Sequence, residues 1–186
     1  MLYPKHGLIY SNKSLFLRRF FYIFFVAILM FLGLSKSVRA ASYYWVGGTG
    51  NWSDINHWAT SSGGTNLHPL PPTSSDDVFI DGNSFTTAGC TLHVDLLNVN
   101  CRTFNITSIT NNPVLWPDIS GVKVHVFGDL LLSSNCDFNL NNLWLEGSST
   151  SAKNINAGGL KLFSITLNQV NQVWQMTDTL WADFIT

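Results

Sequence analysis

The sequence predicts an all-β fold, a parallel β-helix (β-solenoid) closed at its N-terminal end by an aromatic cap. No stretch after residue 41 holds a convincing helical period, whereas short alternating segments such as 91–94 and 122–126 recur. Strand-forming residues are mixed with abundant Asn, Thr, Ser and Gly, which favour turns. An apolar pattern also repeats at a fixed distance near the C-terminus, as β-solenoid coils do.

Residues 1–40 have the organisation of a secretory signal peptide. Basic residues between Lys5 and Arg19 precede an apolar run at 20–34, and Val38-Arg39-Ala40 follows it. The run is short for a membrane span, which needs about 20 residues. We therefore expect cleavage between Ala40 and Ala41, no membrane span afterwards, and a secreted or cell-surface protein. An uncleaved N-terminal anchor is the alternative.

Removing this leader changes the charge of the chain. Six of the ten Lys and Arg residues lie within residues 1–40, and all eleven Asp and Glu residues lie after it. Residues 41–186 therefore carry four basic and eleven acidic side chains, a net charge of −7. So few cations disfavour nucleic acid and anionic membranes as partners.

Residues 41–75 are predicted to form the cap. The segment is rich in Gly, Pro and Ser, and Trp45, Trp52 and Trp58 are spaced seven and six residues apart. His57 and Asp54 lie among these rings, so an acid–base pair or a sugar platform is conceivable. We favour a structural interpretation, in which the rings cover the first coil.

Residues 76–186 are predicted to form the solenoid coils. The repeat consists of two four-residue apolar patterns 22 residues apart: Phe138, Leu140, Leu143 and Leu145, then Leu160, Leu162, Ile165 and Leu167. Each copy reads as two short strands with a bend between them, at Asn141-Asn142 and at Phe163-Ser164. A β-sandwich, which also uses short strands and frequent turns, is the alternative fold.

The cysteines are Cys90, Cys101 and Cys136. An exported protein can form disulfides, and an odd number leaves one thiol outside any intramolecular pair. One bridge, such as Cys90 with Cys101, and three small buried hydrophobic side chains are both open interpretations.

Four oxygen-bearing residues near the start of the coils form a candidate calcium site: Asp76, Asp77, Asp81 and Asn83. Their spacing departs from the EF-hand pattern, because Phe79 occupies a position that needs an oxygen ligand. A turn whose side chains bond to local backbone is the favoured alternative, and no other cofactor is indicated.

Three tryptophans are candidates for stacking on sugar rings, namely Trp116, Trp144 and Trp174. Trp144 stands between Leu143 and Leu145, so strand alternation turns it away from the apolar face. By the same argument, His93 and His125 are expected on the outer face. No catalytic residues are assigned, since no hydrolase, metalloprotease or phosphate-loop motif occurs.

The opening of the cap resembles the start of large secreted surface proteins of Bacteroidetes-type bacteria. The resemblance lies in the segment from Tyr44 to Ser53, in Trp58, and in the run from Asp76 to Asp81. A related opening begins the passenger regions of autotransporter-like adhesins. The resemblance implies an aromatic cap followed by a parallel β-helix, export, and often a C-terminal sorting domain.

The chain differs from that family in its length. Family members usually have many hundreds of residues, whereas this sequence stops at Thr186 without a capping segment. We therefore expect an incomplete solenoid and downstream domains in a longer chain.

These observations predict a non-catalytic, secreted cell-surface β-solenoid segment with a structural or adhesive role. Its expected partners are glycans or components of a host or cell surface. The alternatives are a dedicated glycan-binding module and a polysaccharide lyase or hydrolase built on a β-helix.

Overall fold

The computed structural model describes residues 18–25, 40–148, 150–168 and 171–186. The chain divides into two units, Met1–Val38 and Arg39–Thr186. In the first unit, residues 18–25 are helical and exposed, and the rest of the predicted signal peptide up to residue 39 lies outside the described residues. Among the described residues, no helix combines the length and the apolar character that crossing a bilayer requires.

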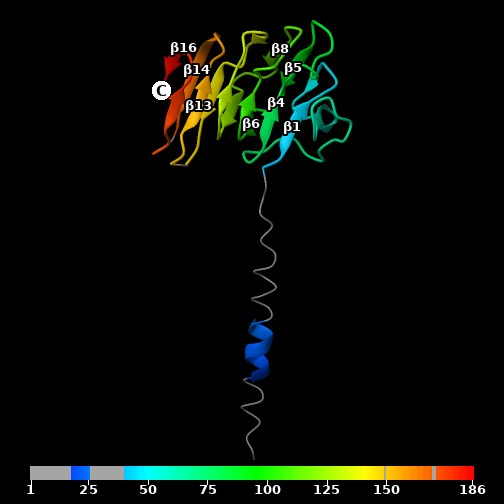
Figure 1. Ribbon diagram of the computed structural model, residues 1–186, viewed down its shortest axis with the longest axis vertical. Helices are drawn as coiled ribbons and strands as arrows, with labels where there is room; N and C mark the ends of the chain where they lie inside the picture. Colours follow the sequence, from blue (N-terminus) through cyan, green and yellow to red (C-terminus); the bar gives the residue numbers. More distant parts are fainter. Residues whose placement is uncertain (1–17, 26–39, 149, 169–170) are drawn as a thin grey trace, which may run out of the picture. The chain divides into compact units, whose positions relative to one another are not determined.

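The second unit is a β-solenoid of about five turns, built from three sheets that we call A, B and C (Figure 1). Sheet A has the order β15-β13-β10-β7-β4-β1-β3, sheet B the order β11-β8-β5-β2, and sheet C the order β16-β14-β12-β9-β6. Among the described residues, every pair of named strands except β1 with β3 is parallel. The predicted β-helix is therefore confirmed and the antiparallel β-sandwich alternative is wrong.

The strands of sheet A are β1 (Ser42–Trp45), β3 (Trp58–Ala59), β4 (Asp77–Phe79), β7 (Phe104–Asn105), β10 (Leu130–Leu131), β13 (Lys153–Asn156) and β15 (Trp174–Met176). Those of sheet B are β2 (Gly50–Asn51), β5 (Thr91–Val94), β8 (Val114–Pro117) and β11 (Asp137–Phe138). Those of sheet C are β6 (Asn98–Cys101), β9 (Lys123–Val126), β12 (Asn142–Leu145), β14 (Lys161–Leu167) and β16 (Trp181–Ile185). A short 3-10 helix, η1 (Ile55–His57), interrupts the N-terminal segment.

Apolar side chains from successive coils stack into ladders that form the core, except at the last strands of sheets A and C, where the ladder residues Met176 and Ile185 are exposed. In sheet A, the register aligns Tyr43, Val78, Phe104, Leu130, Ile155 and Met176. In sheet C, it aligns Val99, Val124, Leu143, Ile165 and Ile185. Alternation places the neighbours of these residues on the outer face, so each strand contributes to both the core and the surface.

The 22-residue repeat is confirmed in its second half, because Leu143 pairs with Ile165 and Leu145 with Leu167. In the first half, Phe138 pairs with Leu115 in sheet B. The spacing varies elsewhere: Val78, Phe104 and Leu130 align at intervals of 26 residues. The bend expected at Phe163-Ser164 lies within the single strand β14, where Leu162 and Ile165 are both buried. The three-residue interval between them breaks the alternation without ending the strand.

An aromatic cluster closes the N-terminal end of the core, as expected. Trp45, Trp52 and Trp58 are all buried, and Trp58 meets the other two rings edge to face with centroid distances of 5.0 and 4.9 Å. Strand β3 pairs antiparallel with β1 and so covers the first edge of sheet A.

Candidate functional site

Trp116 is the exposed aromatic ring of sheet B. Its strand, β8, buries Leu115 completely and leaves Trp116 48% exposed. The register fixes this orientation, because Leu115 pairs with core residue Leu92 and Trp116 pairs with His93. The outward ring is therefore a consequence of burying Leu115.

The corner that follows Trp116 is longer than the equivalent corners of the adjacent coils. Five residues, 118–122, connect β8 to β9, whereas three connect β5 to β6 (95–97) and β11 to β12 (139–141). The strands on both sides remain in register with those of the neighbouring coils. The extra length must therefore bulge outward, and Gly121, with φ of +82°, allows the chain to turn there.

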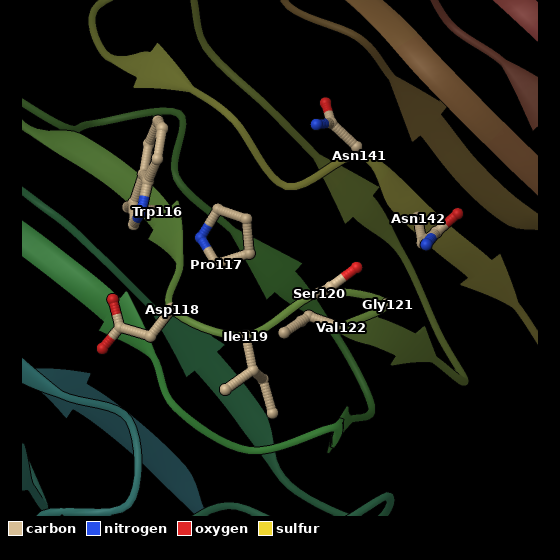
Figure 2. Close-up of a pocket in the computed structure, with 9 residues that line it drawn as sticks. All are labelled: Trp116, Pro117, Asp118, Ile119, Ser120, Gly121, Val122, Asn141 and Asn142. Carbon is tan, nitrogen blue, oxygen red and sulfur yellow. The ribbon is translucent and has the colours of Figure 1, made fainter.

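This bulge forms one wall of a cavity of about 370 Å³, which we call the Trp116 hollow (Figure 2). The hollow is lined by Trp116, Pro117, Asp118, Ile119, Ser120, Gly121, Val122, Asn141 and Asn142. Figure 2 shows Trp116 and Pro117 on one side and the two asparagines, from the next coil, on the other. An exposed indole, apolar walls and nearby hydroxyl, amide and carboxylate groups are the combination that recognises a polar ring with apolar faces.

A contact between His93 and Asp118 holds one edge of the hollow in place. His93 Nδ1 lies 2.7 Å from Asp118 Oδ1, and both side chains are one-third exposed. The Asp118 N–H also donates to the carbonyl oxygen of Val94. Asp118 is thereby anchored to the preceding coil at the point where the longer corner departs from the strand.

Trp144 faces outward on β12, as the alternation predicted, but its ring is half-buried. The Lys123 Nζ lies 4.2 Å from the ring centroid, and the His125 ring lies 5.6 Å away. His125 is held in turn by Glu146 and by Asn98. Trp144 is therefore less open to a ligand than Trp116 is.

Trp174 lies on a different sheet from the other two candidates. It belongs to β15 in sheet A, is half-buried, and packs against the core. The structure thus does not bring the three tryptophans together. Trp181 on β16, which the sequence did not single out, is 64% exposed and pairs with Lys161 across the sheet.

The four candidate calcium ligands are each engaged by protein groups. Asp76 is buried and accepts hydrogen bonds from Ala41 and Thr73. Asp77 binds Arg102, Asp81 accepts from the Asn83 N–H, and Asn83 donates to Ser62. In the ranges that the structure describes, no group of three or more His, Cys, Asp or Glu could hold a metal ion. Asp76 and Asp81 accept from the nearby backbone N–H groups of Thr73 and Asn83, as the turn interpretation expects, whereas Asp77 bonds to Arg102 of the next coil.

His57 belongs to the aromatic cluster, which agrees with the structural interpretation. Its ring stacks on Trp45 at 4.6 Å, and its Nδ1 lies 2.6 Å from the carbonyl oxygen of Val46. Asp54 caps η1 by accepting from the Asn56 N–H, and its carboxylate is 3.9 Å from His57 Nε2.

All three cysteines are free thiols. Cys101 and Cys136 are buried and Cys90 is partly exposed, so the structure matches the interpretation without a bridge. Burial, followed by the negative charge of Asp137, raises the pKa of Cys136 to about 11.

Sequence reasoning identified Trp116 but missed the residues that surround it. Asp118, Ser120, Asn141 and Asn142 come from two coils and meet only because the coils stack. The signal in the sequence was the length of segment 118–122. This segment can be recognised as a long corner only when the strand register of the neighbouring coils is known.

Comparisons with known proteins provide no relative for this chain. No family model matches it, and neither a curated protein nor a solved structure is detectably similar. The fold and the geometry of the hollow are therefore the basis for a functional proposal.

Proposed function

We propose that this chain is an exported, cell-surface β-solenoid segment with an adhesive role, which binds neutral glycans in the Trp116 hollow without cleaving them. The observation that carries the proposal is the half-exposed Trp116 ring at a hollow with polar groups from two coils. Sugar rings present apolar faces that stack on indole and hydroxyl groups that need hydrogen-bond partners.

The charge of the protein favours neutral over acidic glycans. Residues 41–186 carry a net charge of −7, and Asp118 is the ionisable residue among those that line the hollow. A uronate or sulfated polymer would be repelled by these negative charges. Among the described residues, no cationic side chain lines the hollow to bind such a polymer. Binding of a neutral glycan should accordingly change little with salt concentration.

Trp144 provides a second contact for a longer glycan. Asn142 lines the hollow, and Trp144 is two residues further along the outer face of β12. An oligosaccharide that leaves the hollow over Asn142 would reach the indole of Trp144 and the ammonium group of Lys123 beside it. Trp144 then contributes to affinity but is secondary to Trp116.

The proposal is tested by affinity electrophoresis in gels that contain neutral polysaccharides: β-1,3-glucan, β-1,4-glucan, xylan and mannan. We expect one of them to retard the parent protein, and Trp116→Ala to weaken this binding by about tenfold or more. Trp144→Ala should weaken it less. Trp181→Ala is the matched control, because this exposed ring lies on another coil.

Two results would contradict the proposal. One is migration of the parent protein unchanged by all four neutral polymers. The other is a Trp116→Ala variant that is retarded as strongly as the parent. Release of reducing ends or unsaturated products from any bound polymer would instead favour the polysaccharide-degrading alternative.

The adhesive and exported parts of the proposal rest on separate support. A signal-peptide-like leader precedes the solenoid, and the cap resembles that of large bacterial surface proteins. Stacked coils form a stiff support from which corners can vary without disturbing the core. Detection of the protein on the outside of the cell that makes it, by protease accessibility, is the corresponding test.

A further inference from the structure

Asp76 is a buried carboxylate that forms no ion pair among the described residues, because the neighbouring Arg102, whose charge also acts on Asp76, is paired with Asp77. It is 7% exposed, and no ion pair within those ranges includes it. Its Oδ2 accepts from the N–H and the hydroxyl of Thr73, at 3.0 and 2.6 Å. Hydrogen bonds from neutral donors reduce the cost of burying a charge, and a cation bonded directly to the carboxylate would reduce it further.

The remaining oxygen of Asp76 faces the backbone nitrogen of Ala41. The Ala41 N–H donates to Asp76 Oδ1 at 3.1 Å. Backbone contacts hold this nitrogen in place, because the Asp77 N–H donates to the Ala41 carbonyl oxygen at 2.8 Å and Ser42 pairs with Asp77. Ala41 is also the residue that the predicted cleavage would make the N-terminus.

We propose that cleavage of the Ala40–Ala41 peptide bond creates an α-ammonium group on Ala41 that forms an ion pair with Asp76 and completes the fold. This inference rests on the export part of the proposed function, which supplies a signal peptidase. In the hydrolysis, the oxygen of water bonds to the Ala40 carbonyl carbon as the C–N bond breaks. The Ala41 nitrogen leaves as an amine and takes a further proton at neutral pH.

The ion pair between Ala41 and Asp76 would make the stability of the fold depend on cleavage of the leader. Before cleavage, the Ala41 nitrogen is a neutral amide and Asp76 is a buried charge with neutral donors only. After cleavage, the same nitrogen carries a positive charge and three donors at the position that already bonds to Asp76. The processed solenoid is therefore more stable than an otherwise identical solenoid whose N-terminus is uncharged.

The first experiment locates the cut. The full chain is expressed in a bacterial host that exports signal-peptide proteins, and the exported product is analysed by intact mass and N-terminal sequencing. We expect Ala41 as the first residue. A product that is never exported or cleaved contradicts the export proposal, whereas a cut at another bond overturns only the present inference.

The second experiment tests the ion pair in residues 41–186, which contain every member of the hydrophobic core. The chain that begins with free Ala41 is compared with the same chain acetylated on that nitrogen, which removes the charge. We expect acetylation to lower Tm by about 3–6 °C at pH 7. An equal Tm for the two forms would overturn the inference and leave export intact.

Asp76→Asn serves as the partner variant in this comparison. With Asp76 replaced, acetylation should change Tm by less than about 1 °C. If Asp76→Asn does not fold, the ion pair is tested instead by how Tm of the free and acetylated chains depends on pH. An amine whose pKa is raised in the folded state stabilises below its ordinary value of about 7.7–8.0 and loses this effect as pH rises through the folded value. Tyr43 and Arg102, which also interact with Asp76, are the same in both chains, so they do not contribute to the difference. The Tm difference between free and acetylated chains must then disappear at high pH, and its persistence would overturn the pair.

Discussion

Gly50 is a single residue on which the aromatic cluster depends. A β-carbon at this position would lie 2.0 Å from His57 Nε2, and the His57 ring is held between Trp45 and the Val46 carbonyl. Packing against His57 therefore requires glycine at position 50, and the positive φ angles of Gly47 and Gly48 favour glycine there.

Gly50→Ala should lower the free energy of unfolding by about 1–3 kcal/mol, because the imidazole must move out of its stacked position. Chemical denaturation of the two proteins measures this difference. Gly82→Ala is the control, since a β-carbon there meets only ordinary contacts, the nearest at 3.6 Å, and its effect should be small. Equal effects of the two substitutions would contradict the packing explanation.

Asp77 gives the protein a specific sensitivity to acid. Partial burial alone would raise the pKa of Asp77, but hydrogen bonds from Arg102 and Thr103 and the Arg102 charge lower it below the ordinary value of 3.8. A carboxylate with a lowered folded pKa stabilises above its unfolded pKa, and this stabilisation is lost as pH falls through the folded value.

The loss of stability below pH 3.8 should therefore be shallower in Asp77→Asn than in the parent. Thermal unfolding between pH 2 and pH 7 measures both curves. Asp54→Asn, at a more exposed carboxylate, is the control. An acid dependence that is unchanged by Asp77→Asn would show that the Arg102 pair does not contribute.

At the scale of an element, β10 provides an internal comparison between the core and the surface. Leu130 and Leu131 are adjacent and identical in type, but Leu130 is buried between Phe104 and Ile155 whereas Leu131 lies on the outer side. The side-chain environment is therefore the main difference between the two positions.

Leu130→Ala should cost about 2–5 kcal/mol of unfolding free energy, because it leaves a cavity in the ladder of sheet A. Leu131→Ala should cost clearly less. Urea denaturation of both variants provides the measurement. A larger loss of unfolding free energy at Leu131 would mean that Leu131, and not Leu130, faces the core.

The elements also show how far the sequence could predict this fold. The pairing of Leu143 with Ile165 was predictable because the apolar pattern is local and repeats without a length change. The 26-residue intervals between Val78, Phe104 and Leu130 were not, because corners of varied length hide the repeat. The Trp116 hollow was unpredictable for the same reason, as it arises from a length difference between stacked corners.

At the scale of the whole molecule, the solenoid places the core and the proposed glycan site on different sides of its strands. The core ladders run through the coils, whereas Trp116, Asp118 and Asn142 belong to the outer side and its corner. A corner can therefore acquire a binding site while the buried faces remain unchanged. The low number of cations in residues 41–186 is consistent with the neutral glycans that we propose as ligands.

The most direct test of the account is an NMR titration that follows the indole N–H signals of the seven tryptophans. The ligand is a hexasaccharide of whichever neutral polymer retards the protein, and Trp116→Phe assigns the Trp116 signal. We predict that this signal shifts most, that Trp144 shifts less, and that buried Trp45, Trp52 and Trp58 do not respond. A titration in which Trp116 is unmoved while another indole responds would contradict the proposed site.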